Sequence, residues 1–213
     1  MSDNVDVSEY MAGGIDISLP DIPMPEPVKE EKKIVNDEVE TAFKFCFIGS
    51  GQGGGRIAET FHGLGYRKVC AINTAKQDLN TIKLDNKLCI GDGGAGKDPD
   101  VAGEVFASKK EDVVDFMRYS FGDDFDRIFV CVGAGGGTGA GTLEPLVESA
   151  LEVQETLGVK NNKVGAIVAL PKNSEGKRVN ANSFKTLDTA YKLVESGAVS
   201  PLIIVDNEKI SKL

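Results

Sequence analysis

The sequence is short of the residues on which several kinds of site depend. It holds one histidine, His62, no tryptophan, and four cysteines in 213 residues. One histidine leaves little from which to build a histidine-based metal site or a Ser/His/Asp triad. No Cys-x-x-Cys pair occurs, and each cysteine lies in an apolar run typical of a strand. We therefore expect the protein to be cytoplasmic and its four thiols to be buried and reduced. These thiols belong to Cys46, Cys70, Cys89 and Cys131.

Long apolar runs and excess basic charge are also missing. No run approaches the ~18 consecutive apolar residues of a membrane span, and the segment Met1–Asn4 lacks the start of a secretory signal. The net charge is −9, of which residues 1–40 carry −8, with 11 acidic and 3 basic residues. The near-neutral remainder argues against direct nucleic-acid binding. We therefore predict neither a membrane span nor a nucleic-acid partner.

Residues 1–40 differ in composition from the rest of the chain. They hold four of the eight prolines and show no helical period, which predicts an acidic, disordered tail. The stretch Ile15–Met24 is more apolar than a spacer needs, so a docking role for a partner stays open beside that of a solvated leader.

From residue 41 to residue 213, apolar runs alternate with amphipathic segments. This alternation predicts an α/β domain with a doubly wound, mostly parallel sheet of about six strands. The predicted strands are Phe43–Ile48, Lys68–Ile72, Lys87–Ile90, Arg127–Val132, Val164–Leu170 and Leu202–Val205. The predicted helices are Gly54–Leu64, Val101–Tyr119, Gly141–Leu157 and Val179–Glu195, the second with Asp98 as N-cap and Pro99 at its first position.

The first glycine-rich loop, Gly49–Arg56, follows the first predicted strand and opens a helix. Glycines there allow positive φ and let phosphate oxygens reach the N–H groups of a helix N-terminus. The loop also satisfies GxGxxG, so an NAD(P)-dependent oxidoreductase is an alternative. That alternative requires an acid at the end of the second strand to hold the ribose, where this chain has Asn73.

The second loop, Gly133–Thr142, contains six glycines in ten residues and leads into another helix. It predicts a second anion cradle, to which the hydroxyls of Thr138 and Thr142 add ligands for phosphate or a hydrated cation. No lysine follows in the Gly-Lys-Ser/Thr order of a Walker loop. Few families of nucleotide-binding proteins have two phosphate loops on neighbouring strand ends without a Walker lysine.

Several segments together resemble the tubulin/FtsZ family. Gly135–Gly141 is similar to its GGGTG(S/T)G motif. Further segments agree with the family in order: Gly51–Ile57 with GQxGxxI, Ala71–Thr74 with AINTD, Gly94–Pro99 with GAGANP, Pro171–Arg178 with PFxFEGKRR, and Leu202–Lys209 with LIIIPNDKL. The resemblance runs from about Phe43 to Leu213.

This resemblance implies a GTP-binding domain that stacks head to tail with copies of itself into filaments. GTP or GDP is the expected ligand, with Mg²⁺ held through the phosphates rather than by a protein metal site. The implied nucleotide-binding residues are Gly51, Gln52, Gly53, Gly54, Gly55, Arg56, Asn73, Gly94, Ala95, Gly96, Ala134, Gly135, Gly136, Gly137, Thr138, Gly139, Ala140, Gly141, Glu175, Arg178 and Asn207.

The resemblance also implies a role for each part of this set. The first loop with Gln52 would hold the α- and β-phosphates, and Gly94–Gly96 would sense the γ-phosphate. Gly135–Gly141 would wrap the β- and γ-phosphates. Glu175 would accept a hydrogen bond from the ribose hydroxyl, as a carboxylate can. Asn207 would bind the guanine edge, because its amide offers both a donor and an acceptor.

The chain departs from the family in two places. The family's sugar-contacting arginine lies four residues after the glutamate, where this chain has Val179, preceded by Arg178. The sequence ends at Leu213, where the family's long central helix begins, and the acids that act on the next subunit's GTP follow that helix. We therefore expect a fragment, or a protein that lost this part, which binds GTP with little turnover alone.

No catalytic residue is assigned from the sequence. Asp98 and Asp100 would be the first to mutate if this chain hydrolysed GTP by itself. A nucleotide-binding scaffold without turnover is the alternative function within the same fold.

Overall fold

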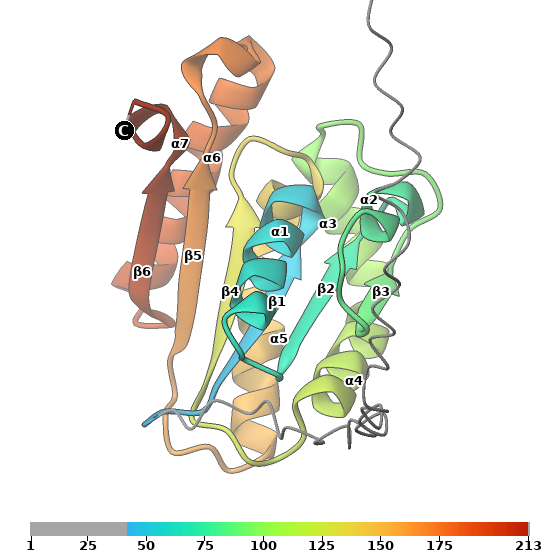
Figure 1. Cartoon of the computed structure of the whole chain (residues 1–213), viewed down its shortest axis with the longest axis vertical. Helices are drawn as coiled ribbons and strands as arrows, with labels where there is room; N and C mark the ends of the chain where they lie inside the picture. The colour runs from blue at the N-terminus through green and yellow to red at the C-terminus, as the bar shows by residue number, and fades with distance from the viewer. Residues whose placement is uncertain (1–41, 213) are drawn as a thin grey trace, which may run out of the picture. The chain divides into compact units, whose positions relative to one another are not determined.

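The six predicted strands form one parallel sheet. The computed structural model describes residues 42–212, and the tail predicted at 1–40 lies outside the described residues. In the described part the sheet has the order β3-β2-β1-β4-β5-β6, and every neighbouring pair is parallel (Figure 1). The strands are β1 (Phe45–Ser50), β2 (Val69–Asn73), β3 (Lys87–Cys89), β4 (Arg127–Gly133), β5 (Val164–Leu170) and β6 (Val199–Asp206).

Helices cover both faces of this sheet, as the doubly wound prediction requires (Figure 1). One face packs against α1 and α2, and the other against α3, α4, α5 and α6. The helices are α1 (Gly51–Gly63), α2 (Lys76–Asn80), α3 (Pro99–Ser108), α4 (Lys110–Phe121), α5 (Thr138–Thr156), the 3-10 turn η2 (Asn173–Glu175), α6 (Lys177–Glu195) and α7 (Asn207–Ile210).

Alternate residues of the central strands enter two separate apolar clusters. Cys46 and Ile48 of β1 pack with α3, α4 and α5, while Phe47 between them packs with α1. A strand buried on both faces needs an unbroken apolar run, which explains the sequence pattern. Within residues 42–212 no helix is both long and apolar enough to cross a membrane.

The structure divides one predicted helix in two and moves the start of several elements, among them α1 and α5, which begin three residues before the predicted Gly54 and Gly141. The helix expected over Val101–Tyr119 is two helices, α3 and α4, separated at Lys109. Buried residues continue at helical spacing across the break, so the apolar period did not reveal it. Strand β6 begins at Val199, three residues before the predicted start, because an edge strand tolerates the missing N–H of Pro201.

One of the four thiols is not buried. Cys46, Cys70 and Cys131 lie in the core, and burial raises the pKa of each. Cys89 is exposed, which contradicts the prediction of four buried thiols. It ends β3, an edge strand of three residues that pairs with β2 alone.

Candidate functional site

A cleft of about 520 Å³ lies at the carboxyl ends of the strands. Segments that follow β1, β2, β3, β4, β5 and β6 all contribute to its lining. In an open parallel sheet this edge is the usual place for a ligand, because the connecting loops leave a crevice there. The two glycine-rich loops are therefore brought to one site with the more distant Glu175 and Asn207.

The first loop is a tight turn from β1 into α1. Gly51 has a φ of +70°, a conformation open to glycine, and α1 starts at that residue. A Cβ at Gly51 would lie 2.9 Å from the Gly139 nitrogen, so the first and second loops touch each other. The first N–H groups of α1 have no partner within the helix, and the residues that carry them, Gly51, Gln52 and Gly53, line the cleft.

Two residues predicted from this loop are packed closely against other parts of the chain. A Cβ at Gly54 would overlap the carbonyl group of Cys131, and a Cβ at Gly55 would lie 3.2 Å from Ile82. These glycines let α1 cross β4 and pack against the loop after α2, and neither lines the cleft.

The glycines of the second loop serve close approach rather than unusual φ. None of the glycines from Gly133 to Gly141 has a positive φ. A Cβ at Gly141 would overlap the carbonyl group of Pro99, and one at Gly139 would lie 2.8 Å from the Gly133 oxygen. Gly136 differs, since its Cβ would meet no atom within 4 Å and the residue lines the cleft. The loop therefore leaves open space at Gly136 for a ligand.

Buried hydroxyl groups tie this loop to the neighbouring strand ends. The Thr138 hydroxyl lies 2.8 Å from that of Thr74 and donates to Asn73 Oδ1 at 3.3 Å. The Thr142 hydroxyl donates to the Thr138 carbonyl at 2.8 Å and lies 2.6 Å from the Ser50 hydroxyl. Thr142 is fully buried and does not line the cleft, so the structure does not bring its hydroxyl to the place expected for phosphate or a cation. Thr138 does line it.

The loop after β3 forms the outer wall. Gly94 and Gly96 have φ of +82° and +55°, and the Gly94 N–H donates to the Thr74 carbonyl at 3.1 Å. A Cβ at Gly137 would lie 2.8 Å from the Cβ of Ala95 and 2.8 Å from the backbone nitrogen of Asp98. This loop therefore packs directly on the second glycine loop.

The opposite end of the cleft is built by the segments after β5 and β6. Glu175 lies in η2, where its Oε1 accepts from the Lys172 N–H at 2.7 Å. Asn207 is the first residue of α7, and both residues line the cleft. Glu208 accepts from the Asn173 N–H at 3.2 Å and so joins α7 to η2. The Lys212 ammonium, and next the Asn173 N–H, lower the pKa of Glu208.

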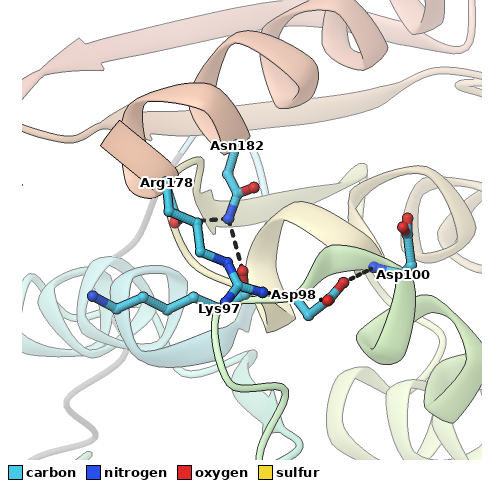
Figure 2. Close-up of polar contacts among 6 residues, drawn as sticks. Lys97, Asp98, Asp100, Arg178 and Asn182 are labelled. Carbon is cyan, nitrogen blue, oxygen red and sulfur yellow. Dashed lines mark hydrogen bonds and ion pairs between the residues drawn. The ribbon is translucent and has the colours of Figure 1, made fainter. Parts of the chain in front are cut away.

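Arg178 is placed outside the lining of the cleft. Its guanidinium pairs with the Asp98 carboxylate at 3.3 Å, and that carboxylate also caps α3 through the Asp100 N–H at 3.1 Å (Figure 2). The N-cap and Pro99 predictions for this helix are thereby confirmed. The Asn182 amide nitrogen, one turn further along α6, donates to the carbonyl oxygen of Lys97 at 2.9 Å (Figure 2).

The cleft brings together thirteen of the predicted residues and leaves out eight. Those that line it are Gly51, Gln52, Gly53, Gly94, Ala95, Gly96, Gly135, Gly136, Gly137, Thr138, Gly139, Glu175 and Asn207. Those outside its lining are Gly54, Gly55, Arg56, Asn73, Ala134, Ala140, Gly141 and Arg178. Ten lining residues are absent from the list of predicted nucleotide-binding residues: Ser50, Thr74, Ala75, Asp78, Gly93, Lys97, Gly133, Ala169, Pro171 and Val179.

Most of these residues lie within a segment that resembles the family or next to one, so counting each whole segment with one or two flanking positions would have included them. Asp78 is different, because it lies in α2, a helix of five residues that is too short to show a period. Among the residues that the structure describes, no group of three or more His, Cys, Asp or Glu is suited to a metal ion.

A comparison with known families agrees with this arrangement. The GTPase domain of the Tubulin/FtsZ family matches residues 44–213. The chain belongs to the tubulin/FtsZ family. The predicted resemblance over Phe43–Leu213 and the predicted fold are confirmed.

Individual members of the tubulin/FtsZ family are moderately similar. The cell division protein FtsZ of Aquifex aeolicus is 31% identical over 184 residues, which cover 83% of this chain and 46% of that protein. A GDP-bound monomer of CetZ1 from Haloferax volcanii is 25% identical, with a TM-score of 0.63 over 78% of this chain and 51% of the other.

A GTPγS-bound protofilament of CetZ2 from the same organism is 26% identical, with a TM-score of 0.63 over 78% of this chain and 49% of the other. The chain thus spans about half the length of the tubulin/FtsZ relatives it matches.

Proposed function

We propose that this chain is the guanine-nucleotide-binding part of a filament-forming, tubulin/FtsZ-like cytoskeletal GTPase that works in the cytoplasm. The observation that carries the proposal is the convergence of three glycine-containing loops with Glu175 and Asn207 on one cleft. Membership of the family and the names of its GDP-bound and GTPγS-bound relatives support the guanine nucleotide.

The residues of the cleft suit the parts of such a nucleotide. The N–H groups at the starts of α1 and α5 would bind the phosphates, as helix N-termini commonly do. The open space at Gly136 fits a phosphate, and Mg²⁺ would be held through the phosphates. At the other end, Glu175 would accept from the ribose hydroxyl and Asn207 would bind guanine with its amide.

The alternative of an NAD(P)-dependent oxidoreductase is not favoured. Asn73 stands where the ribose-binding acid is needed. Its Oδ1 accepts from the Ala75 N–H at 3.1 Å and from the Thr138 hydroxyl at 3.3 Å, so its side chain is engaged beneath the loops. A nucleotide-binding scaffold without turnover remains the second form of the proposal, and measured phosphate release separates the two.

The proposal extends to self-association. Relatives of known structure are described as a dimer or as protofilaments, which supports head-to-tail stacking of this domain. A head-to-tail contact uses two different surfaces, so it continues into a filament instead of closing. A partner for residues 1–40 also remains a proposal, since those residues lie outside the described part.

Replacing Asn207 by alanine tests the base-binding end. We expect Asn207→Ala to lower GDP affinity about tenfold, because guanine loses hydrogen bonds and leaves polar groups unpaired. Competition against a fluorescent GDP derivative measures the loss. Asn80→Ala is the matched control, since Asn80 is exposed at the end of α2 and does not line the cleft. Equal affinities for both variants would remove Asn207 from the site.

A further inference from the structure

The cleft has an uneven charge. Of the described residues that line it, Lys97 alone is basic, while Asp78 and Glu175 are acidic. A nucleoside triphosphate brings several negative charges to this lining, and the glycine loops offer only backbone dipoles. Neither loop carries the lysine of a Walker motif. The charge of Lys97 is therefore the only full positive charge that these side chains offer to a phosphate.

The backbone of Lys97 is held in a conformation that a lysine rarely adopts. Its φ is +61°, and it is the one non-glycine residue with positive φ in residues 42–212. Glycine would occupy this position without steric cost, as Gly96 does next to it. Residues in such strained conformations persist when their surroundings fix them, and they gather at functional sites.

The surroundings fix Lys97 from both sides. The Asn182 amide nitrogen donates to the Lys97 carbonyl at 2.9 Å and to the Gly135 carbonyl at 3.3 Å, so one buried side chain joins two loops. The next residue, Asp98, is held by Arg178 and by its capping bond to α3. Figure 2 shows the Lys97 side chain extended away from Asp98, while Arg178 reaches toward it. The Lys97 ammonium is thus not engaged by the neighbouring carboxylate.

We propose that Lys97 binds the terminal phosphate of a nucleoside triphosphate and that Asn182 and Arg178 position it; this rests on the proposed nucleotide-binding function. Lys97 would distinguish triphosphate from diphosphate through a charge-assisted hydrogen bond. Arg178, the residue expected at the sugar, acts here through Asp98. The preference for triphosphate therefore depends on a side chain rather than on backbone N–H groups alone.

The test compares affinity for GTPγS with affinity for GDP in lysine variants of the whole chain. Lys97→Met removes the charge, and Lys97→Gly removes both the charge and the strained φ. We expect each to lower GTPγS affinity roughly 10- to 100-fold and GDP affinity only a few-fold. Lys97→Arg keeps the charge and is expected to retain most of the preference. Lys76→Met is the control, because Lys76 is exposed nearby without lining the cleft.

Salt provides a second readout. The GTPγS affinity of the unmodified chain is expected to fall more steeply with ionic strength than that of Lys97→Met, because one exposed ion pair is missing from the variant.

The Asn182→Leu variant tests whether Asn182 positions Lys97. It is expected to reduce the ratio of GTPγS to GDP affinity, and adding Lys97→Met is expected to reduce the ratio little further.

Three outcomes have distinct meanings. A selective loss of GTPγS binding in both Lys97→Met and Lys97→Gly supports the assignment. An unchanged GTPγS-to-GDP ratio in folded variants overturns it while the proposed function stands. If the unmodified chain binds neither nucleotide, the proposed function fails and the role of Lys97 fails with it. The melting temperature of Lys97→Gly separates loss of folding from loss of binding, because glycine relieves the positive φ.

Discussion

Replacing Gly136 by valine is expected to lower GTP affinity by roughly 100-fold or more, because the side chain would overlap the space for the phosphates. The melting temperature of the free protein should stay unchanged. A Cβ at Gly136 meets no atom of the protein within 4 Å, and φ there is not positive, so the substitution costs the fold little. Calorimetric titration with GTP and a thermal melt of the same sample measure both quantities.

The matched control for this substitution is Gly63→Val. Gly63 ends α1, its Cβ would also meet nothing within 4 Å, and it does not line the cleft. Gly137→Val is a poorer test, because its Cβ would lie 2.8 Å from Ala95 and would push two loops apart. Wild-type affinity for GTP in folded Gly136→Val would show that phosphate does not bind in this cradle.

The second large effect concerns turnover. We expect the 213-residue chain alone to release phosphate at a near-background rate at every protein concentration. Loss of a group that orients the attacking water typically costs ~10²–10⁴ in rate. In the proposed filament that group would come from the neighbouring subunit. Adding a partner that carries the family's central helix and acidic loop is expected to restore turnover and make it concentration-dependent.

A robust rate that is linear in the concentration of this chain would contradict that expectation. The base would then lie within the chain, and the structure changes which residue to replace first. Asp98 is held by Arg178, and neither it nor Asp100 lines the cleft. Asp78 does line it, so Asp78→Asn is the variant to assay first.

The sequence predicted the fold well because the decisive signals are local. Strands buried on both faces must be apolar throughout, and glycine loops at their ends mark the ligand edge of a parallel sheet. The collinear segments also identified the family, and with it residues as distant as Gly51, Glu175 and Asn207. The structure brings these three to one cleft.

The predicted and observed surroundings differ where a residue's neighbours come from distant parts of the chain. Gly54 and Gly141 looked like phosphate-binding glycines, yet they allow contact with Cys131 and Pro99 from distant parts of the chain. The pairing of Arg178 with Asp98 spans 80 residues and has no local signature. Short helices such as α2 and α7 likewise hold too few residues to display a period.

Isothermal titration of this chain with GTP, GDP, ATP and NAD tests the central claim most directly. The amide of Asn207 suits the guanine edge, and no acid at the end of β2 serves the NAD ribose. We therefore predict that GTP and GDP bind at least about tenfold more tightly than ATP or NAD. Tighter binding of NAD, or equal binding of ATP and GTP, would contradict the account.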